Sequence, residues 1–215
     1  MAVPAAALRR PRFGPRACGM DEVGRGALAG PLVAAAVVLP RSFRHPLLRD
    51  SKQLTPHQRE EVEPLIRRAA RAVELVTIGV EVINRWGIGW ANREAFRLLM
   101  DRIVAPMYLC DGNLVIPTPL VYRSVVGGDH LVPAISAASI VAKVHRDHLM
   151  RELHHHFPQY WWHSNKGYGT PAHLRALRQH GSCPHHRLSF IHPEQLELLE
   201  LEAVAMAQSG SAAAT

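Results

Sequence analysis

The sequence has few cysteines and no long uninterrupted hydrophobic run. Its three cysteines are an odd number without a CxxC spacing, which argues against a disulfide framework and favours free thiols in a reducing compartment. The longest apolar run, ALAGPLVAAAVVLP, is interrupted by Gly30 and Pro31 and is too short to span a bilayer. Residues 1–16 lack the apolar segment of a signal peptide and are typical of a flexible basic arm. We therefore expect a cytoplasmic protein that does not enter membranes.

The sequence is also poor in acidic residues relative to basic ones. It has 25 Lys and Arg against 18 Asp and Glu among its 215 residues, a net charge of +7. Four of the acids follow the last basic residue, Arg187, so residues 1–190 carry about +11. This excess favours a polyanionic partner such as nucleic acid, but charge alone is equally compatible with a role in solubility. The 47% of hydrophobic residues is enough for one sizeable globular core.

Strand-like and helix-like segments alternate along the chain, which predicts the α/β class. Short apolar segments predict strands at 17–22, 32–39, 75–80, 107–111 and 120–126. Helical spacing of apolar residues predicts helices from 56 onward, at 90–104, at 132–157 and at 171–180. Thr55 and Gln58 can form a capping box, whereas Pro64 predicts a kink or a restart. We expect an arm at 1–16, a domain at 17–190, and an acidic helix with a loose tail at 191–215.

Acidic residues recur where the predicted strands end. Asp21 and Glu22 follow the first strand, Asp111 ends another, and Asp129 comes after a third. Strand ends open into one crevice in α/β sheets, where converging carboxylates would need hard divalent cations. Two Mg²⁺ or Mn²⁺ ions would suit phosphodiester hydrolysis, although each acid taken alone is more often an ordinary loop residue. Because strand neighbours face opposite ways, we expect a bulge or the following turn to redirect Glu22.

The stretch VGRGALAG follows these acids directly. Gly24 and Gly26 would let the backbone approach a ligand closely, and Arg25 could reach a phosphate or a sugar. The pattern is weakly similar to dinucleotide-binding glycine loops, but the preceding acids would repel a pyrophosphate. A nucleotide-dependent oxidoreductase and a non-catalytic nucleic-acid-binding module are therefore the alternatives to a nuclease.

Six segments of the chain resemble, in order, the conserved blocks of bacterial ribonuclease HII. They are MDEVGRGALAGPLVAAAVVLP, DSKQLT, LCDGN, GGDHLVPAISAASIVAKVHRDHLM, NKGYGTPAHLRAL and CPHHRLSF, and they extend from about Cys18 to Phe190. The resemblance implies a ribonuclease H-like mixed sheet flanked by helices, with a small helical extension at the C-terminus. It also implies a monomer that cleaves the RNA strand of RNA–DNA hybrids. Single ribonucleotides in duplex DNA would be cut on their 5′ side, leaving a 3′-hydroxyl and a 5′-phosphate.

The resemblance also implies a role for particular residues. The metal-binding catalytic acids fall on Asp21, Glu22, Asp111 and Asp129. The element that reads the ribose 2′-hydroxyl, the group that distinguishes RNA from DNA, falls on Gly24, Arg25 and Gly26. The stacking tyrosine falls on Tyr168, beside Lys166. Lys52 could hold a phosphate, and further candidates for substrate binding are Lys143, Arg146 and Arg187.

The chain departs from the family pattern at three positions near these residues. Gly127 stands where lysine is usual, which alters the charge balance around Asp129. Asn165 replaces the commoner histidine and Gly169 the commoner proline, which raises the question of how stiff the loop around Tyr168 is.

Several other polar or aromatic residues have a simpler reading than a direct part in catalysis. Asp147 could approach the metals, but a salt bridge that anchors its helix is the favoured interpretation. The histidines at 154–156 diverge around a helix and the CPHH segment offers too few ligands, so neither predicts a metal site. For Trp161 and Trp162, packing within the protein is at least as well supported as stacking on nucleic acid.

Overall fold

The computed structural model describes residues 17–43, 45–49 and 54–192. The chain forms two compact units. Within the described ranges, the sheet unit comprises residues 17–23, 33–77 and 92–145, and the helical unit comprises residues 24–32, 78–91 and 146–192. The predicted arm at 1–16, Lys52 and the acidic helix expected from residue 193 lie outside the described residues.

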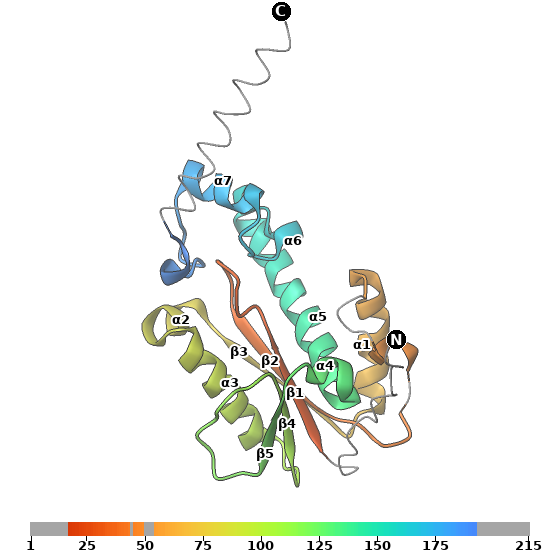
Figure 1. Cartoon of the computed structure of the whole chain (residues 1–215). Helices are drawn as coiled ribbons and strands as arrows, with labels where there is room; N and C mark the ends of the chain where they lie inside the picture. The colour runs from red at the N-terminus through yellow and green to blue at the C-terminus, as the bar shows by residue number, and fades with distance from the viewer. Residues whose placement is uncertain (1–16, 44, 50–53, 193–215) are drawn as a thin grey trace, which may run out of the picture. The chain divides into compact units, whose positions relative to one another are not determined.

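The sheet is mixed and has five strands (Figure 1). The strands are β1 (Cys18–Val23), β2 (Leu32–Val38), β3 (Ala72–Ile78), β4 (Tyr108–Asp111) and β5 (Tyr122–Val125). Their order is β3-β2-β1-β4-β5; β1 is antiparallel to β2 and parallel to β4, and β4 is parallel to β5. The predicted α/β class with a mixed sheet is confirmed.

The strand sequences explain where each strand lies and where it ends. All seven residues of β2 are buried, as its unbroken Leu, Val and Ala composition requires of a strand covered on both faces. β3 begins and ends earlier than the predicted 75–80. Its predicted end was wrong because Gly79 is already the N-cap of α2 (Val80–Trp86), a helix that the periodicity did not reveal.

Helix α1 (Pro56–Ala69) begins as predicted. The Gln58 N–H donates to Thr55 Oγ1, and the Thr55 N–H donates to Gln58 Oε1, so both halves of the capping box form. The helix continues through Pro64 without stopping, so the predicted restart does not occur. Proline removes one hydrogen bond, but the rest of a fourteen-residue helix tolerates that loss here.

The other α-helices are α3 (Ile88–Arg102), α4 (Gly128–Leu131), α5 (Pro133–His156), α6 (Trp162–Asn165) and α7 (Pro171–His180). Short 3₁₀ helices lie at Pro46–Arg49, Pro158–Tyr160 and Leu188–Phe190. The predicted end of α7 is confirmed, since Gly181 is its C-cap with φ of 72°. In the part of the chain that the structure describes, no helix has the length and apolar character needed to cross a membrane.

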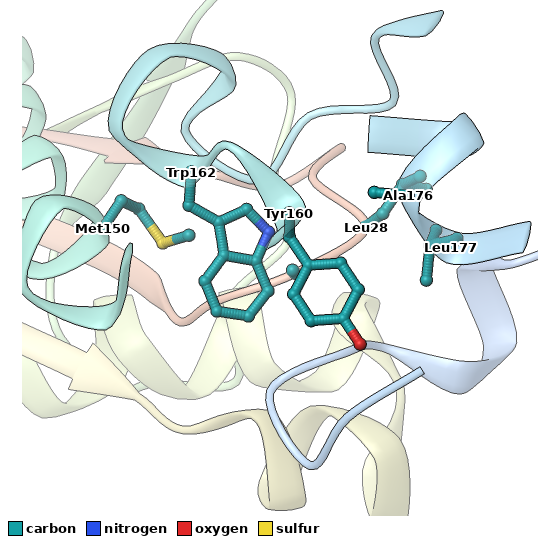
Figure 2. Packing of buried hydrophobic residues seen from close by; sticks show 7 residues of the cluster. Leu28, Met150, Tyr160, Trp162, Ala176 and Leu177 are labelled. Carbon is teal, nitrogen blue, oxygen red and sulfur yellow. The ribbon is translucent and has the colours of Figure 1, made fainter. Parts of the chain in front are cut away.

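Each unit has its own apolar cluster. In the sheet unit, Leu109 of β4 packs with Val132, which precedes α5, and with Ile135 in the first turn of α5. In the helical unit, Trp162 and Tyr160 lie side by side, with Met150 of α5 against Trp162 (Figure 2). Trp162 is fully buried, which confirms the packing interpretation for this residue, whereas Trp161 is 55% exposed.

Candidate active site

Asp21 and Asp111 lie next to each other at the ends of two parallel strands. Met20 of β1 is paired with Cys110 of β4, and the two aspartates are the next residue on each strand. Residues in register on parallel neighbours point to the same face. On β4 that face is set by Leu109, two residues earlier, which packs against Val132 and Ile135. The predicted meeting of these acids at a strand end is therefore explained by the register of β1 and β4.

The side chain of Asp111 is oriented by a hydrogen bond from the backbone of Gly128. Its Oδ1 accepts a hydrogen bond of 2.7 Å from the N–H of Gly128. A Cβ on Gly128 would lie 2.6 Å from Ile135 Cδ1 and 3.2 Å from that same carboxylate oxygen, so a larger residue here would require the Ile135 side chain or Asp111 to shift. Asp129, the next residue, is 1% exposed and lies in the first turn of the short helix α4 rather than at the end of a strand. The preceding Gly127 has a left-handed φ of 65°.

Glu22 reaches the same strand end from the other face. Its backbone N–H donates to Asp21 Oδ1 at 2.8 Å, and its Oε1 accepts from Asn92 Nδ2 of α3 at 3.2 Å. Asp21 instead interacts with the Ser139 hydroxyl of α5. The expected bulge was wrong, because the pairing with β2 stays regular through Val23.

The electrostatics of this cluster centre on Asp21. Its carboxyl is 7% exposed, and burial raises its pKa well above the ordinary value, with Asp111 and Glu22 adding repulsion. As the side chains stand, no three His, Cys, Asp or Glu residues in the described ranges are grouped to hold one metal ion. The repulsion at Asp21 and the absence of a three-ligand group among the described residues are both consistent with two neighbouring carboxylates that have further acids nearby. They are not consistent with a preformed set of ligands around one ion.

The glycine-arginine-glycine segment begins the helical unit, directly after β1. Gly24 has φ of 88°, and a Cβ there would lie 2.1 Å from Arg146 Nε, so this position requires glycine. Its carbonyl accepts from Arg187 Nη1 at 2.6 Å. Arg25 and Gly26 are exposed. The buried Arg187 thus holds the backbone at Gly24 by a hydrogen bond, while Arg25 and Gly26 are exposed to solvent.

Arg146 and Arg187 do not lie where direct phosphate binding would place them. Both are 0% exposed. Arg146 donates to the carbonyls of Pro31, Ala29 and Lys166 at 2.8–3.1 Å. Arg187 donates to the carbonyls of Gly24, Arg25 and Gly30 at 2.6–3.1 Å. This geometry does not support the prediction that they bind phosphate, because their guanidinium groups are already occupied by backbone carbonyls.

The loop that carries Tyr168 is tied down on several sides. Asn165 Oδ1 accepts from the Gly167 N–H at 2.8 Å, and its Nδ2 donates to the Tyr160 carbonyl at 2.7 Å. The Gly167 carbonyl accepts from the N–H groups of residues 28 and 29. The half-buried Tyr168 ring lies with its centroid 5.4 Å from Arg146 Cζ. Asn165, a departure from the family pattern, therefore contributes hydrogen bonds that hold the loop.

The remaining predicted residues are less constrained by the structure. Lys143 is half-buried on α5, and Lys166 is half-buried with a left-handed φ of 51°. Asp147 is buried, and its charge is one of the influences that raise the pKa of Arg146 against the larger lowering by burial. Sequence reasoning missed Asn92 and Ser139. The signal was available in Asn92, a polar residue directly beside Ala91 on the apolar side of α3.

Comparison with known proteins shows the family to which this chain belongs. The family model for ribonuclease HII matches residues 18–193. The chain is 47% identical over 174 residues to ribonuclease HII of a Polaromonas species, covering 80% of this chain and 87% of that protein.

Two solved structures share the fold. A chain in the PCNA:RNase HII complex from Archaeoglobus fulgidus matches with a TM-score of 0.71 and 26% identity, covering 82% of this chain and 96% of that chain. Bst-RNase HIII in complex with Mn²⁺ matches with a TM-score of 0.62 and 18% identity, covering 86% of this chain and 70% of that chain, which shows a likeness of fold alone. The chain therefore belongs to the ribonuclease HII family, which acts on RNA–DNA hybrids, and is a ribonuclease H, an endoribonuclease of the hydrolase class.

Proposed function

We propose that this ribonuclease H depends on divalent metal ions bound at Asp21, Glu22, Asp111 and Asp129. The observation that carries the proposal is the pairing of β1 with β4, which sets the buried Asp21 beside Asp111; burial and the charges of Asp111 and Glu22 also raise the pKa of Asp21. Buried carboxylates set this close are costly unless protonated or balanced by a cation. All four side chains offer hard oxygen ligands, which suit Mg²⁺ or Mn²⁺.

The pairwise arrangement of Asp21 and Asp111 suits such ions. Mg²⁺ usually takes one or two protein carboxylates and keeps several waters or substrate oxygens, so it does not need a preformed protein cage. When bound, a pair of these ions supplies Lewis acidity to the scissile phosphate and activates a water. Asp111 would keep its orientation through the Gly128 amide, and Glu22 through Asn92. The Mn²⁺ complex of the structurally similar Bst-RNase HIII supports this choice of metal.

Substrate recognition would come from the helical unit. Gly24, Arg25 and Gly26 would read the ribose 2′-hydroxyl, and Tyr168 would stack on the adjoining sugar, with Lys166 beside it. The support is the rigid attachment of both segments to Arg146 and Arg187, described above, together with the exposure of residues 25 and 26. A contact group held in place before binding loses less entropy when substrate arrives.

The proposed reaction is cleavage of the RNA strand in hybrids and incision on the 5′ side of a single ribonucleotide in duplex DNA. The products would carry a 3′-hydroxyl and a 5′-phosphate. Lys52 and Lys143 remain our candidates for phosphate contacts. We further propose that residues 17–190 act as one catalytic domain and that the enzyme works as a cytoplasmic monomer in ribonucleotide removal.

The test is a cleavage assay on an end-labelled DNA duplex that contains one ribonucleotide. Incision on the 5′ side of the ribonucleotide is expected with Mg²⁺ or Mn²⁺ and none with EDTA; an RNA–DNA hybrid and an all-DNA duplex serve as positive and negative controls. Cleavage that persists in EDTA would refute the metal site. Cleavage of the hybrid without incision at the single ribonucleotide would refute only the finer substrate assignment.

A further inference from the structure

A chain of buried hydrogen bonds in the helical unit ends on the backbone of Tyr168. His173 in the first turn of α7 and His186 are both 0% exposed. Their Nε2 atoms lie 3.1 Å apart, and the Trp162 Nε1 lies 3.1 Å from the same His173 Nε2. His173 Nδ1 lies 3.0 Å from the Tyr168 carbonyl oxygen. At the other end, the Cys183 N–H lies 3.0 Å from His186 Nδ1.

The donors at the two ends determine where the protons sit. The indole N–H of Trp162 can only donate, so His173 Nε2 accepts and the proton of the neutral ring is on Nδ1, facing the Tyr168 carbonyl. The backbone N–H of Cys183 can only donate, so His186 Nδ1 accepts and its proton is on Nε2. His186 Nε2 therefore donates to His173 Nε2. His173 Nε2 thus shares its lone pair between two donors, Trp162 Nε1 and His186 Nε2, and no contact in the chain sets two donors against each other.

The same network requires both rings to be neutral. A proton added to His173 Nε2 would face the Trp162 N–H, and one added to His186 Nδ1 would face the Cys183 N–H. Burial lowers the pKa of His186 to about 4, with the His173 ring adding to the effect, and burial also lowers the pKa of His173. The neutral form with this arrangement of protons is thus the one that the protein stabilises near pH 7.

Tyr168 needs such support because its neighbours have irregular backbone. Lys166 and Gly167 both have left-handed φ values, so no regular helix or strand orients the next residue. The Tyr168 carbonyl accepts from only two groups that the structure shows in the described ranges: the Thr170 N–H at 2.8 Å and His173 Nδ1. Of these, only the histidine is a side chain and can be altered without changing the loop backbone.

We propose that His173, held as the Nδ1–H tautomer by Trp162 and His186, is a positioning residue that fixes Tyr168 for recognition of a ribonucleotide. The inference rests on the proposed stacking role of Tyr168. It assigns His173 no contact with substrate or metal. Loss of the Nδ1 donor would let the carbonyl turn and the ring leave its place, which weakens discrimination of a single ribonucleotide more than chemistry at the metal-binding acids.

The tautomers are tested first, without any activity measurement. Nitrogen-15 NMR of the full-length protein at pH 7 is expected to show His173 protonated on Nδ1 and His186 protonated on Nε2. The opposite tautomer at either ring, or a charged ring, would overturn the proposal.

The second test compares two amides at position 173. His173→Asn keeps an N–H donor at the distance of Nδ1 from the backbone, whereas His173→Gln carries its amide further out, near the position of Nε2. We expect His173→Asn to incise a single-ribonucleotide duplex within about twofold of wild type and His173→Gln to lose about tenfold through a raised KM, because small displacements of a contact group cost large factors. His180→Gln, at the exposed end of α7, is the matched control.

A double-mutant cycle then connects His173 to Tyr168. If His173 acts through Tyr168, His173→Gln adds no further loss to Tyr168→Ala. Equal losses in the Asn and Gln variants, or a full loss on the Tyr168→Ala background, would overturn the proposal. If Tyr168→Ala itself incises normally, positioning of Tyr168 is refuted while metal-dependent cleavage by the enzyme stands. Circular dichroism restricts the comparison to folded variants.

Discussion

In the sheet unit the buried charge at the site is negative and concentrated, whereas in the helical unit it is positive and distributed over backbone carbonyls. Asp21 and Asp111 lie side by side, and burial with the neighbouring carboxylates raises the pKa of Asp21. Arg146 and Arg187 are equally buried, yet between them they donate to six different carbonyl groups. The arginines have hydrogen-bond partners within the protein, whereas the acids repel one another, which is the basis for proposing a cation there.

This difference in hydrogen bonding distinguishes the acids, which would act on substrate, from the arginines, which hold the backbone of the site in place. A buried charge that is hydrogen-bonded or paired within the protein contributes to its structure. A buried charge that is repelled by its neighbours indicates a binding site for a ligand of opposite charge. Burial lowers the pKa of Arg187 to about 9, with Arg146 contributing repulsion, so even here two like charges share one region. The carbonyls offset that cost by accepting their hydrogen bonds.

The largest expected effect comes from removing charge in the sheet unit. Asp21→Asn should reduce cleavage at least about a thousandfold, because it removes a proposed ligand of the cation that would balance charge on the scissile phosphate. The same change should raise the free energy of unfolding of the metal-free protein, because it removes a buried carboxyl that Asp111 and Glu22 repel. Cleavage rates with Mg²⁺ and urea unfolding with EDTA measure the two effects.

Hybrid binding by this variant should be largely retained. Full activity of Asp21→Asn with Mg²⁺ would show that the carboxylate does not bind a catalytic ion. Lower stability without metal would show that repulsion at Asp21 is already balanced within the protein.

The sequence alone predicted the acids because their positions follow from local patterns. Asp111 ends a short apolar strand, and Asp21 stands near the end of another, so their meeting needed only the rule that parallel strands end together. The regular pairing that keeps Asp21 and Glu22 on opposite faces could not be predicted, since it depends on the register with β2. The amide of Gly128 on Asp111 joins residues 17 apart and has no local signature.

The helical unit was less predictable for a related reason. Arginines are usually exposed, so Arg146 and Arg187 in a basic chain suggested phosphate contacts. Their burial depends on carbonyls more than 100 residues away in sequence, such as Ala29 for Arg146 and Gly24 for Arg187. The CPHH segment was considered only for metal binding, which gives no hint of the contact between His173 and His186.

A change in the helical unit should act on stability first. Arg187→Met keeps most of the volume but removes the donors to Gly24, Arg25 and Gly30, leaving those carbonyls without their buried partner. We expect the free energy of unfolding to fall by about 3–5 kcal/mol, as for other broken buried networks, and incision of a single ribonucleotide to weaken at temperatures where the variant stays folded.

Arg85→Met provides the control for this variant, because it removes an exposed arginine from the same unit. It should change stability by less than about 0.5 kcal/mol. If Arg187→Met lowered the free energy of unfolding no more than Arg85→Met does, the hydrogen bonds from Arg187 to the carbonyls would not contribute to stability.

The third effect is a pH dependence that belongs to the helical unit. An unfolded histidine has a pKa near 6.5, whereas burial lowers that of folded His186 to about 4. Between these values the unfolded state binds more protons, so the free energy of unfolding should fall as pH decreases from about 6.5 to about 4, by roughly 3 kcal/mol in total. Above pH 7 this histidine contributes no slope.

Urea unfolding of wild type and His186→Gln at pH 7 and pH 5 measures this contribution. The variant should be less stable at pH 7 but should lose less on acidification. His173 and Cys183 contact the same ring and the charge of His185 acts on it, so an equal slope in both proteins would assign the pH dependence to other groups.

The smallest effect should come from the sheet unit, at a position away from its acids. Thr55→Ala removes the N-cap of α1 and should cost about 1 kcal/mol of stability. Because no charge of the cluster changes, cleavage at a temperature well below the unfolding transition should equal wild type. Asp21→Asn should gain stability and lose cleavage, whereas Thr55→Ala should lose stability and keep cleavage, so the two variants separate the two measurements. A fall in cleavage for Thr55→Ala would mean that the acid cluster depends on the overall stability of its unit. Groups that act on substrate and groups that stabilise the fold could then not be distinguished in the sheet unit.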